Sequence, residues 1–389
     1  MVEDGGIKVK VVVGIDSFKG SASSAELNQA VASSIKEVAG VTAVWPVSVS
    51  DGGEGAVASL QQRLDGQMKT VTTIDLLGRR IQAPYFTFVF ENENYAAIES
   101  ASVVGLDKVV PSPETIRQAS SYGLGIALRK LDQQHFDHIL IFLGGTGVSD
   151  GGLGVLRAFD GAIKDNKGQL LEEGNLLLQA ASINLSKLSR LHSDLMIATD
   201  VTNPYSGESG AAKVYARQKG ATLEQVNQLD TNAHQIASHI HESGGPDLDK
   251  SAGAGAAGGL GGALQLIGGQ ICQGFPTMAK FLRLDDLFEK TDLVITGEGK
   301  LDRQSTFGKV PFGMAKLAEK YAVPTVVLCG SKQIATCPKI FAGIFSIQPG
   351  PISLTDAMNK ENTLANIGNT AYNILSTIQH VFAQRPQEG

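Results

Sequence analysis

The stretch from Lys8 to Ile15 (KVKVVVGI), followed by Asp16 to Gly20 (DSFKG), determines how the rest of the chain is interpreted. The first eight residues are mostly β-branched and apolar, a pattern typical of a strand buried on both faces of a parallel sheet. The next five are polar and end in glycine, which indicates a loop. Ser23 or Ser24 can then cap a helix whose apolar residues recur at helical spacing. The segment predicts a strand, a loop and a helix in succession.

The same succession returns further along the chain. A second strand from Ala43 to Val49 ends in the loop SDGGEG at 50–55, and a helix begins there. Near the other end, Asp292 to Thr296 (DLVIT) reads as a strand, with a polar loop over 297–309 and then another helix. Both ends of the chain therefore have the pattern of an α/β fold.

The middle of the chain has a different pattern. Between residues 68 and 102, three short strands follow one another through turns too short to hold helices, and single strands come later. We therefore expect a discontinuous domain, residues 1–66 and 285–389, with a second α/β domain over 67–284 inserted into it.

Composition excludes several classes of protein. Of 389 residues, 42% are hydrophobic and 19% are charged, which argues against a largely disordered chain. The apolar runs are too short to span a membrane. A net charge of −6 argues against general affinity for nucleic acid. The first residues lack the basic and apolar regions of a secretory signal, so we expect a cytoplasmic protein.

Glycine-rich acidic loops follow predicted strands repeatedly, and ligands of doubly wound sheets bind at the carboxyl ends of strands. Each loop alone fits an ordinary turn, in which Asp and Gly are common. Five such loops in one chain favour a ligand site. They are residues 16–20, 50–55, 144–152, 199–204 and 296–305.

The segment from Ser251 to Gly262 is the richest in glycine. Gly253, Gly255 and Gly258 match the dinucleotide fingerprint, but the residues before them are polar rather than strand-like, so the match fails its context. Two interpretations stay open. The glycines let backbone N–H groups approach a phosphate at the start of a helix, or they let small residues pack closely.

The loops together carry the groups that phosphoryl transfer requires. Carboxylates hold Mg²⁺ against nucleotide phosphates and accept the proton of the attacking hydroxyl, while cations balance the charge of the transferred group. The candidate carboxylates are Asp16, Asp51, Glu54, Asp150, Asp200, Glu298 and Asp302. The candidate cations are Lys19, Arg79, Arg80, Lys300, Arg303 and Lys309.

Taken in order, these loops resemble those of the bacterial type I glycerate kinase family. The matching segments span nearly the whole chain, and one departure is Ala252, where the family pattern has proline. The segments are DSFKG at 16–20, SDGGEG at 50–55, GGTGVSDGG at 144–152, TDVTNP at 199–204, GAGAAGGLG at 253–261 and TGEGKLDRQS at 296–305.

The resemblance implies ATP-dependent phosphorylation of D-glycerate with Mg²⁺, and 2-phosphoglycerate as the product. It also implies two α/β lobes, a doubly wound flavodoxin-like lobe formed by both chain ends and an inserted lobe described as restriction-enzyme-like, with the active site in the cleft between them. No nucleic acid or membrane partner is implied, and the protein is expected to be a monomer or a homodimer.

Roles for individual residues follow as hypotheses. We assign Asp200, Lys19 and Asp51 to catalysis, with Asp200 as the general base or a metal ligand. The carboxylate of D-glycerate needs a cation and N–H donors, for which Ser17, Lys19 and Arg79 are the candidates. The remaining assignments are Gly253, Gly255, Gly258, Gly259, Lys309 and Ser305 to ATP or its phosphates, and Glu298 and Asp302 to Mg²⁺.

Two rival functions stay open at this point. A kinase of another small hydroxy acid could use the same scaffold. A regulator that binds a nucleotide or metabolite without catalysis would keep the glycine loops but should have lost the acidic residues, and Asp51, Asp200, Glu298 and Asp302 are all present.

Overall fold

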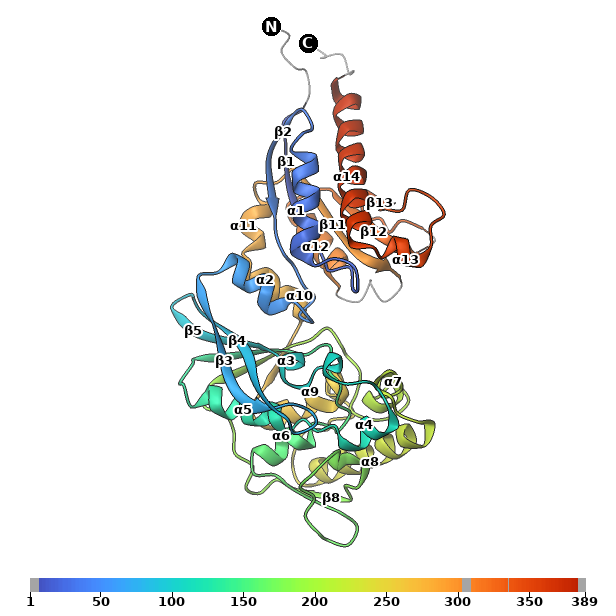
Figure 1. The fold of residues 1–389 in the computed structure, drawn as a ribbon. Helices are drawn as coiled ribbons and strands as arrows, with labels where there is room; N and C mark the ends of the chain where they lie inside the picture. The colour runs from blue at the N-terminus through green and yellow to red at the C-terminus, as the bar shows by residue number, and fades with distance from the viewer. Residues whose placement is uncertain (1–6, 303–308, 335, 384–389) are drawn as a thin grey trace. The chain divides into compact units, whose positions relative to one another are not determined.

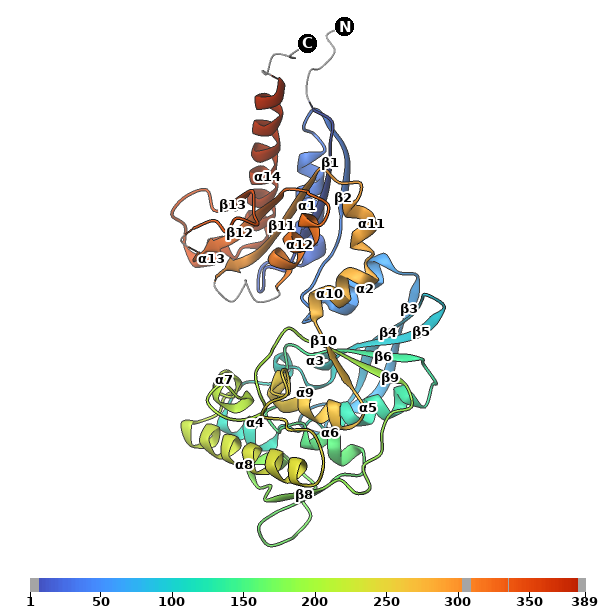
Figure 2. The ribbon, with the colours of Figure 1, turned by 180° about the vertical axis from the view of Figure 1, so that it is seen from behind.

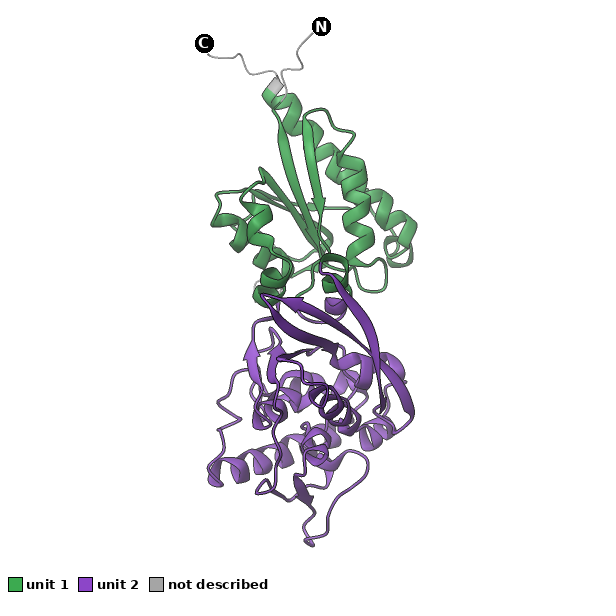
Figure 3. Cartoon of the chain, turned by 90° about the vertical axis from the view of Figure 1, so that its left-hand side faces the viewer, with its two compact units in different colours: residues 1–51, 58–63, 275–389 green, residues 52–57, 64–274 purple. Residues whose placement is uncertain are grey.

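The computed structural model describes residues 7–302, 309–334 and 336–383. The chain divides into two compact units, coloured separately in Figure 3. Unit 1 comprises residues 1–51, 58–63 and 275–389, and unit 2 comprises residues 52–57 and 64–274. Unit 1 is thus formed mainly from the two ends of the chain. The domain boundaries expected from the sequence, at 66/67 and 284/285, stay a prediction.

Unit 1 is built on a five-stranded sheet in the order β13-β12-β11-β1-β2, in which every neighbouring pair is parallel. Numbered along the chain within this unit, the strand order is 2-1-3-4-5, which is the flavodoxin-like arrangement. The strands are β1 (Val9–Ile15), β2 (Val41–Pro46), β11 (Leu293–Leu301), β12 (Thr325–Lys332) and β13 (Gly343–Ser346). The strand predicted from the opening segment is therefore confirmed.

Helices cover both faces of this sheet (Figures 1 and 2). On one face, Val11 and Val13 pack with Leu27 of α1 and Ile367 of α14, all fully buried. On the other, Phe312 of α12 packs against buried strand residues of β11 and β12. The helices that lie wholly in unit 1 are α1 (Ser24–Ile35), α11 (Leu284–Phe288), α12 (Val310–Glu319), α13 (Leu354–Ala357) and α14 (Lys360–Ala383). The helices α2 (Ala56–Arg63) and α10 (Gly274–Phe281) begin in unit 2 and end in unit 1.

Unit 2 has a six-stranded mixed sheet in the order β10-β9-β6-β5-β4-β3. Only β4 runs against its neighbours, so β3, β5, β6, β9 and β10 all end at the same edge. The strands are β3 (Gly66–Ile74), β4 (Arg80–Phe90), β5 (Glu93–Glu99), β6 (His138–Phe142), β9 (Asp194–Ala198) and β10 (Gln270–Cys272), with a separate pair β7 (Ala162–Lys164) and β8 (Ser182–Asn184).

The helices of unit 2 pack with this sheet around one large apolar core, in which Ile139, Ile141 and Leu128 are fully buried. They are α3 (Ser100–Val104), α4 (Pro113–Gln118), α5 (Tyr122–Asp132), α6 (Leu153–Ala158), α7 (Ala211–Tyr215), α8 (Leu223–Glu242) and α9 (Ala256–Leu266), with 3₁₀ turns η1 (Leu106–Lys108), η2 (Leu176–Leu178) and η3 (Arg217–Lys219). Among the described residues of both units, no helix is both long enough and apolar enough to cross a bilayer. The predicted α/β fold class is confirmed.

Candidate active site

The carboxyl ends of β1 and β11 form the first candidate site, in unit 1. These strands are neighbours in the sheet but far apart in the sequence, and the strand order reverses between them. At such a switch point the loops that follow the two strands diverge, which leaves a crevice where ligands bind. Asp16 follows β1 directly, and its backbone N–H donates to the carbonyl of Gly297 in β11 at 2.9 Å.

Buried polar side chains of α1 fix where this loop begins. Asn28, 1% exposed, accepts from the N–H of Ile15 at 2.8 Å and donates to the carbonyl of Val47 at 3.0 Å. Ser24 accepts from the N–H of Val49 at 3.1 Å. Two residues of one helix therefore tie the end of β1 to the segment after β2. Sequence analysis assigned Asn28 no role, and its only signal was a polar residue on the apolar face of a predicted helix.

Three carboxylates gather at the switch point. Burial, together with the negative charges of Asp51 and Glu298, raises the pKa of Asp16 from 3.8 to about 7. A hydrogen bond from the N–H of Ser17, at 2.7 Å, and the charge of Lys19 act in the opposite direction. A carboxyl group with a pKa near 7 exchanges a proton readily at neutral pH. Asp16 was among the carboxylates noted in the sequence but had no assigned role.

Glu298 lies inside a strand, which corrects the prediction that a loop begins at residue 297. β11 continues to Leu301 because its pairing with β12 continues, with Glu298 opposite Cys329. Glu298 is 5% exposed, and Lys309 at the start of α12 approaches its carboxylate at 3.3 Å. Burial and the charge of Glu298 raise the pKa of the Cys329 thiol to about 11.

Unit 2 presents a second group of loops at the shared edge of its sheet. Asp200 follows β9, and its carboxylate accepts the N–H of Gly274 at 2.8 Å. A Cβ on Gly52 would lie 2.7 Å from the Cα of Gly274, so the two glycines pack backbone against backbone. Gly144, after β6, packs in the same way on Gly53. Glycine is required at these contacts because no side chain fits.

A half-buried carboxylate, Glu99, bonds to the helix that follows the loop SDGGEG. Glu99 ends β5 and accepts the N–H of Val57, in the first turn of α2, at 3.0 Å. Burial raises the pKa of Glu99, while this hydrogen bond and others from the start of α2 lower it. An acidic group near the N–H groups of a helix start is favourable. Sequence analysis missed Glu99, whose only signal is a charge directly after an apolar strand.

The loop GGTGVSDGG, residues 144–152, lies at the same edge of the sheet, and hydrogen bonds from buried side chains hold it in place. The fully buried carboxylate of Asp150 accepts the backbone N–H of Ser121 at 2.7 Å and that of Gly152 at 3.1 Å. Tyr205 donates its hydroxyl proton to the carbonyl of Gly151 at 2.6 Å. The buried amine of Lys219, which sequence analysis also missed, donates to the carbonyl of Val148 at 2.6 Å.

Comparison with known proteins relates these loops to an enzyme family. Residues 11–379 match the family model described as "Glycerate kinase family". A glycerate kinase of Bacillus subtilis is 33% identical, over 95% of this chain and 98% of its own. A glycerate 2-kinase of Escherichia coli is 32% identical, over 83% and 85%.

The chain belongs to the glycerate kinase family.

A solved structure agrees with this assignment. A protein of Salmonella typhimurium LT2, described as a glycerate kinase 2, superposes with a TM-score of 0.79 at 32% identity, covering 96% of this chain and 99% of its own. The chain is therefore a kinase, and the alternative of a regulator without catalysis is set aside.

In this glycerate kinase family member, the residues predicted for the site fall in two places. Ser17, Lys19 and Asp51 belong to unit 1, as do Glu298 and Lys309. Asp302, also in unit 1, lies just beyond the end of β11, 3.5 Å from Lys300. Ser305 lies outside the described residues. Asp200, Arg79 and the predicted phosphate-binding glycines belong to unit 2.

Arg79 has structural partners of its own. It lies in the turn between β3 and β4, 57% exposed, with its Nε 2.5 Å from the Asp75 carboxylate. Its Nη2 donates to the carbonyl of Lys108 at 3.0 Å. Part of the guanidinium is therefore committed to holding the turn, and its exposed part is what remains for a substrate.

The glycine segment is tightly packed. Gly253, Gly255, Gly258 and Gly259 are all buried, and the backbone at Ala257, Gly258 and Gly259 is left-handed. A Cβ on Gly258 would collide with the carbonyl oxygen of Val148, and one on Gly255 with that of Pro204. The packing interpretation accounts for these contacts. The assignment of the four glycines to phosphate binding stays a prediction.

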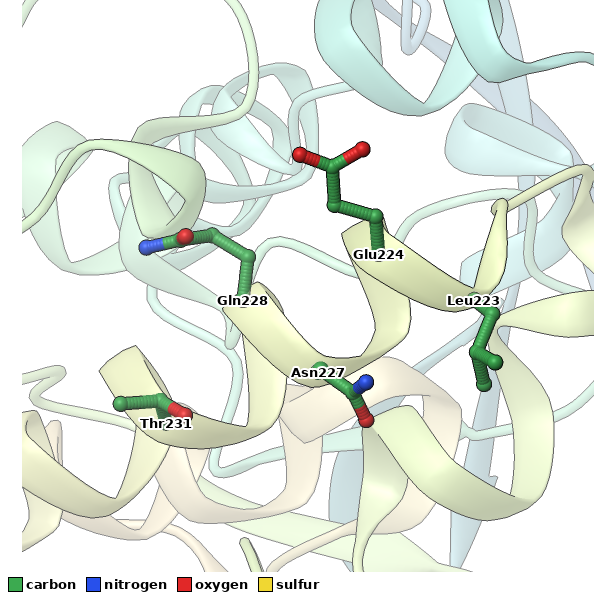
Figure 4. Close-up of a pocket in the computed structure, with 5 residues that line it drawn as sticks. All are labelled: Leu223, Glu224, Asn227, Gln228 and Thr231. Atoms are coloured by element: carbon green, nitrogen blue, oxygen red, sulfur yellow. The ribbon is translucent and has the colours of Figure 1, made fainter.

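A surface depression elsewhere has no relation to the predicted residues. It has a volume of about 470 Å³ and is lined by side chains from the first turns of α8 (Figure 4). They are Leu223, Glu224, Asn227, Gln228 and Thr231. A depression on one helix, without groups from a strand end, offers no convergent chemistry, so the candidate site stays at the sheet edges.

Proposed function

We propose that this kinase transfers the γ-phosphoryl group of ATP to the 2-hydroxyl of D-glycerate, giving 2-phosphoglycerate and ADP, and that it does so in the cytoplasm as a monomer or homodimer. Membership of the glycerate kinase family carries this proposal. The choice of the 2-hydroxyl follows the Escherichia coli relative named a glycerate 2-kinase. The acidic cluster at the switch point of unit 1 supports it, because phosphoryl transfer depends on positioned charge.

The donor set at the switch point fits Mg²⁺. The charges of Asp51 and Glu298 both raise the pKa of Asp16, so negative charge is concentrated where a cation would be stabilised. Among the described residues, no three His, Cys, Asp or Glu side chains are arranged to hold a metal. Mg²⁺ is usually bound by one or two protein carboxylates and completes its coordination with substrate phosphates. Glu298 and Asp302 are the proposed ligands, and the ion would neutralise phosphate charge.

Cations and N–H donors then bind the substrates. In the proposal, the backbone and hydroxyl of Ser17 and the amine of Lys19 bind the carboxylate of D-glycerate, with Arg79 contributing its exposed part. Lys309 balances phosphate charge, and Asp51 together with Lys19 orients the reacting groups. In unit 2, the exposed Gly145 follows β6, the neighbour of the strand β9 that ends two residues before Asp200. In the proposal, the loop 144–152 contacts a substrate anion through this exposed backbone.

Asp200 is the proposed general base. As the oxygen at C2 of glycerate bonds to the γ-phosphorus, the bond from that phosphorus to the bridging oxygen breaks and ADP leaves. The hydroxyl proton passes to the carboxylate of Asp200. Because Gly274 donates to one oxygen of this carboxylate, the side chain is already oriented when the substrate binds.

Phosphorus NMR of the purified protein with Mg·ATP and D-glycerate tests the proposal. A new monoester signal that matches 2-phosphoglycerate, absent without D-glycerate, is the expected result. A signal of 3-phosphoglycerate would overturn the acceptor position while leaving the kinase. Intact ATP and no new signal would reject D-glycerate as the substrate, and the same assay would then be run with other small hydroxy acids.

A further inference from the structure

Lys219 is a lysine in an unusual place. It ends the turn η3 in unit 2 and is 3% exposed, whereas lysine side chains are almost never fully buried unless they are paired. Gly220 follows it in a left-handed conformation with φ of 101°, and a Cβ there would collide with the backbone of Ser112. The backbone at Lys219 is therefore held in place, and the side chain is directed into the interior.

Among the described residues, the amine of Lys219 bonds to two residues of one loop. Its Nζ donates to the carbonyl of Val148 at 2.6 Å and to the hydroxyl of Thr146 at 3.3 Å. Both partners belong to the loop 144–152, and both are buried. Without the amine, the Val148 carbonyl would lose its donor in a place that water does not reach, which is costly.

A second buried charge lies close to the same loop. The carboxylate of Asp150 is fully buried, and its attraction acts to keep the amine of Lys219 protonated. Burial acts in the opposite direction and lowers the pKa of Lys219 from 10.5 to about 8. The amine of Lys219 and the carboxylate of Asp150 thus attract each other in the interior of unit 2. An apolar side chain would avoid the cost of burying a charge, but it would leave the Val148 carbonyl without its donor, so lysine is suited to holding this loop.

The loop has an inner and an outer side. Thr146 and Val148 face Lys219 and are buried, whereas Gly144 is half-buried and Gly145 is exposed. The exposed part follows β6, next to the strand that precedes Asp200. A ligand can therefore reach the backbone of the loop on one side, while Lys219 fixes it on the other.

We propose that Lys219 is a positioning residue for phosphorylation: its ammonium group, bonded to Val148 and Thr146, holds the loop 144–152 in the conformation that receives the substrate anion. This rests on the proposed function, in which that loop contacts the substrate. Lys219 acts through the loop and does not touch the reacting atoms.

Two variants test the role, Lys219→Met and Lys219→Gln. Methionine fills the space without a donor, and glutamine keeps an N–H donor without the charge. The matched control is Lys213→Met in α7, whose amine donates to Asn227 at 2.8 Å outside the loop. Circular dichroism and a thermal melt establish folding. Hydrogen exchange over 144–152 reports the loop, and kcat and KM are measured separately for D-glycerate and ATP.

We expect kcat to fall about 100-fold in Lys219→Met and less in Lys219→Gln, because misplacing a binding group by about 1 Å has effects of this size. Exchange over 144–152 should rise in parallel, while β1 and the control variant stay unchanged. Folded variants with normal kcat and normal exchange would overturn the proposal. So would failure of both to fold, which would assign Lys219 to the stability of unit 2.

Failure of the proposed function is recognised separately. If the wild-type protein does not phosphorylate D-glycerate, the substrate assignment fails before any variant is compared. The exchange measurement then still decides whether Lys219 holds the loop, and kcat is measured with whichever acceptor the wild type uses.

Discussion

The loops at the switch point of unit 1 and those at the sheet edge of unit 2 have similar compositions and opposite environments. In unit 1, Asp16, Asp51 and Glu298 interact with one another as like charges. In unit 2, the carboxylate of Asp150 is surrounded by the N–H groups that it accepts. An aspartate in a glycine-rich loop can therefore be a reactive group or can hold the backbone in place. The groups that surround its carboxylate decide between these two roles.

The difference follows from the two sheets. In unit 1 the strand order reverses between β1 and β11, which opens a crevice at their carboxyl ends. In unit 2 the loop 144–152 is covered by the glycine segment, with the N–H of Gly151 donating to the carbonyl of Gly258 at 3.0 Å. Close backbone packing consumes hydrogen-bonding capacity, and an open crevice leaves it to a ligand.

Asp200 is the expected exception to this difference between the units. It lies at the sheet edge of unit 2, where carboxylates support the backbone, yet it is proposed to react. Asp200→Asn should lower kcat about 10²–10⁴-fold, the contribution of a general base. The fold should survive, since the amide oxygen can still accept from Gly274. Steady-state rates and a thermal melt measure the two effects. Asp194→Asn, at the exposed start of the same strand, is the control, and a near-normal rate for Asp200→Asn would remove it from catalysis.

Gly258→Ala tests whether the glycine segment supports the backbone or binds phosphate. The position has φ of 77° and lies against the carbonyl of Val148, so the free energy of unfolding should fall by about 3 kcal/mol or more. At Gly244, φ is 86° and nothing lies within 4 Å, so Gly244→Ala should cost only about 1–2 kcal/mol.

Urea titration measures both unfolding free energies, and KM for ATP is measured alongside. A stable Gly258→Ala protein with a raised KM for ATP would favour the phosphate-binding interpretation. That result would also mean that the glycine segment takes part in the reaction, as the loops of unit 1 are proposed to do, and does not only support the backbone of unit 2.

Asp16 should make stability depend on pH. Its pKa is about 7 in the folded protein against an ordinary 3.8, so the folded state binds more protons between these values. The contribution of Asp16 is thus fully present below about pH 4 and is lost as pH rises through about 7. Asp16→Asn removes the charge. The free energy of unfolding of this variant, relative to that of the wild type, should therefore increase as the pH rises from about 4 to above 7, by on the order of 3 kcal/mol at pH 8.

Urea unfolding at pH 5 and pH 8 without Mg²⁺ measures that difference. Glu54→Gln, an exposed carboxylate of the loop SDGGEG, serves as the control and should show no such trend. A constant difference between Asp16→Asn and wild type at the two pH values would mean that the three carboxylates of unit 1 do not interact as described.

The smallest effects are expected for the substrate cations. Lys19→Met and Arg79→Met should each raise KM for D-glycerate up to about tenfold, because each removes one charged hydrogen bond to a carboxylate. KM for ATP should not change. Arg80→Met, the exposed neighbour of Arg79, is the matched control. An unaltered KM for D-glycerate in Lys19→Met would mean that the loop after β1 does not bind the substrate carboxylate.

Much of the fold was predictable because periodicity and loop chemistry are local. The apolar run before Asp16 became β1, and of the two caps suggested for α1, Ser23 is the one used. Glu26, which had no predicted role, completes the cap. The order of the motifs along the chain identified the family. The extent of β11 was not predictable in the same way, since its continuation to Leu301 depends on pairing with β12, which is distant in sequence.

The sequence by itself determined that α/β segments form both chain ends and that acidic and glycine-rich loops follow the strands, although not where each strand ends. Only the tertiary structure decided which charges meet. Asn28, Glu99 and Lys219 lie in segments whose local patterns give no reason to assign them a role, and each acquires one from partners far along the chain. The physical reason is that burial and electrostatic interaction depend on distances in space, and residues remote in sequence set those distances only once the chain has folded.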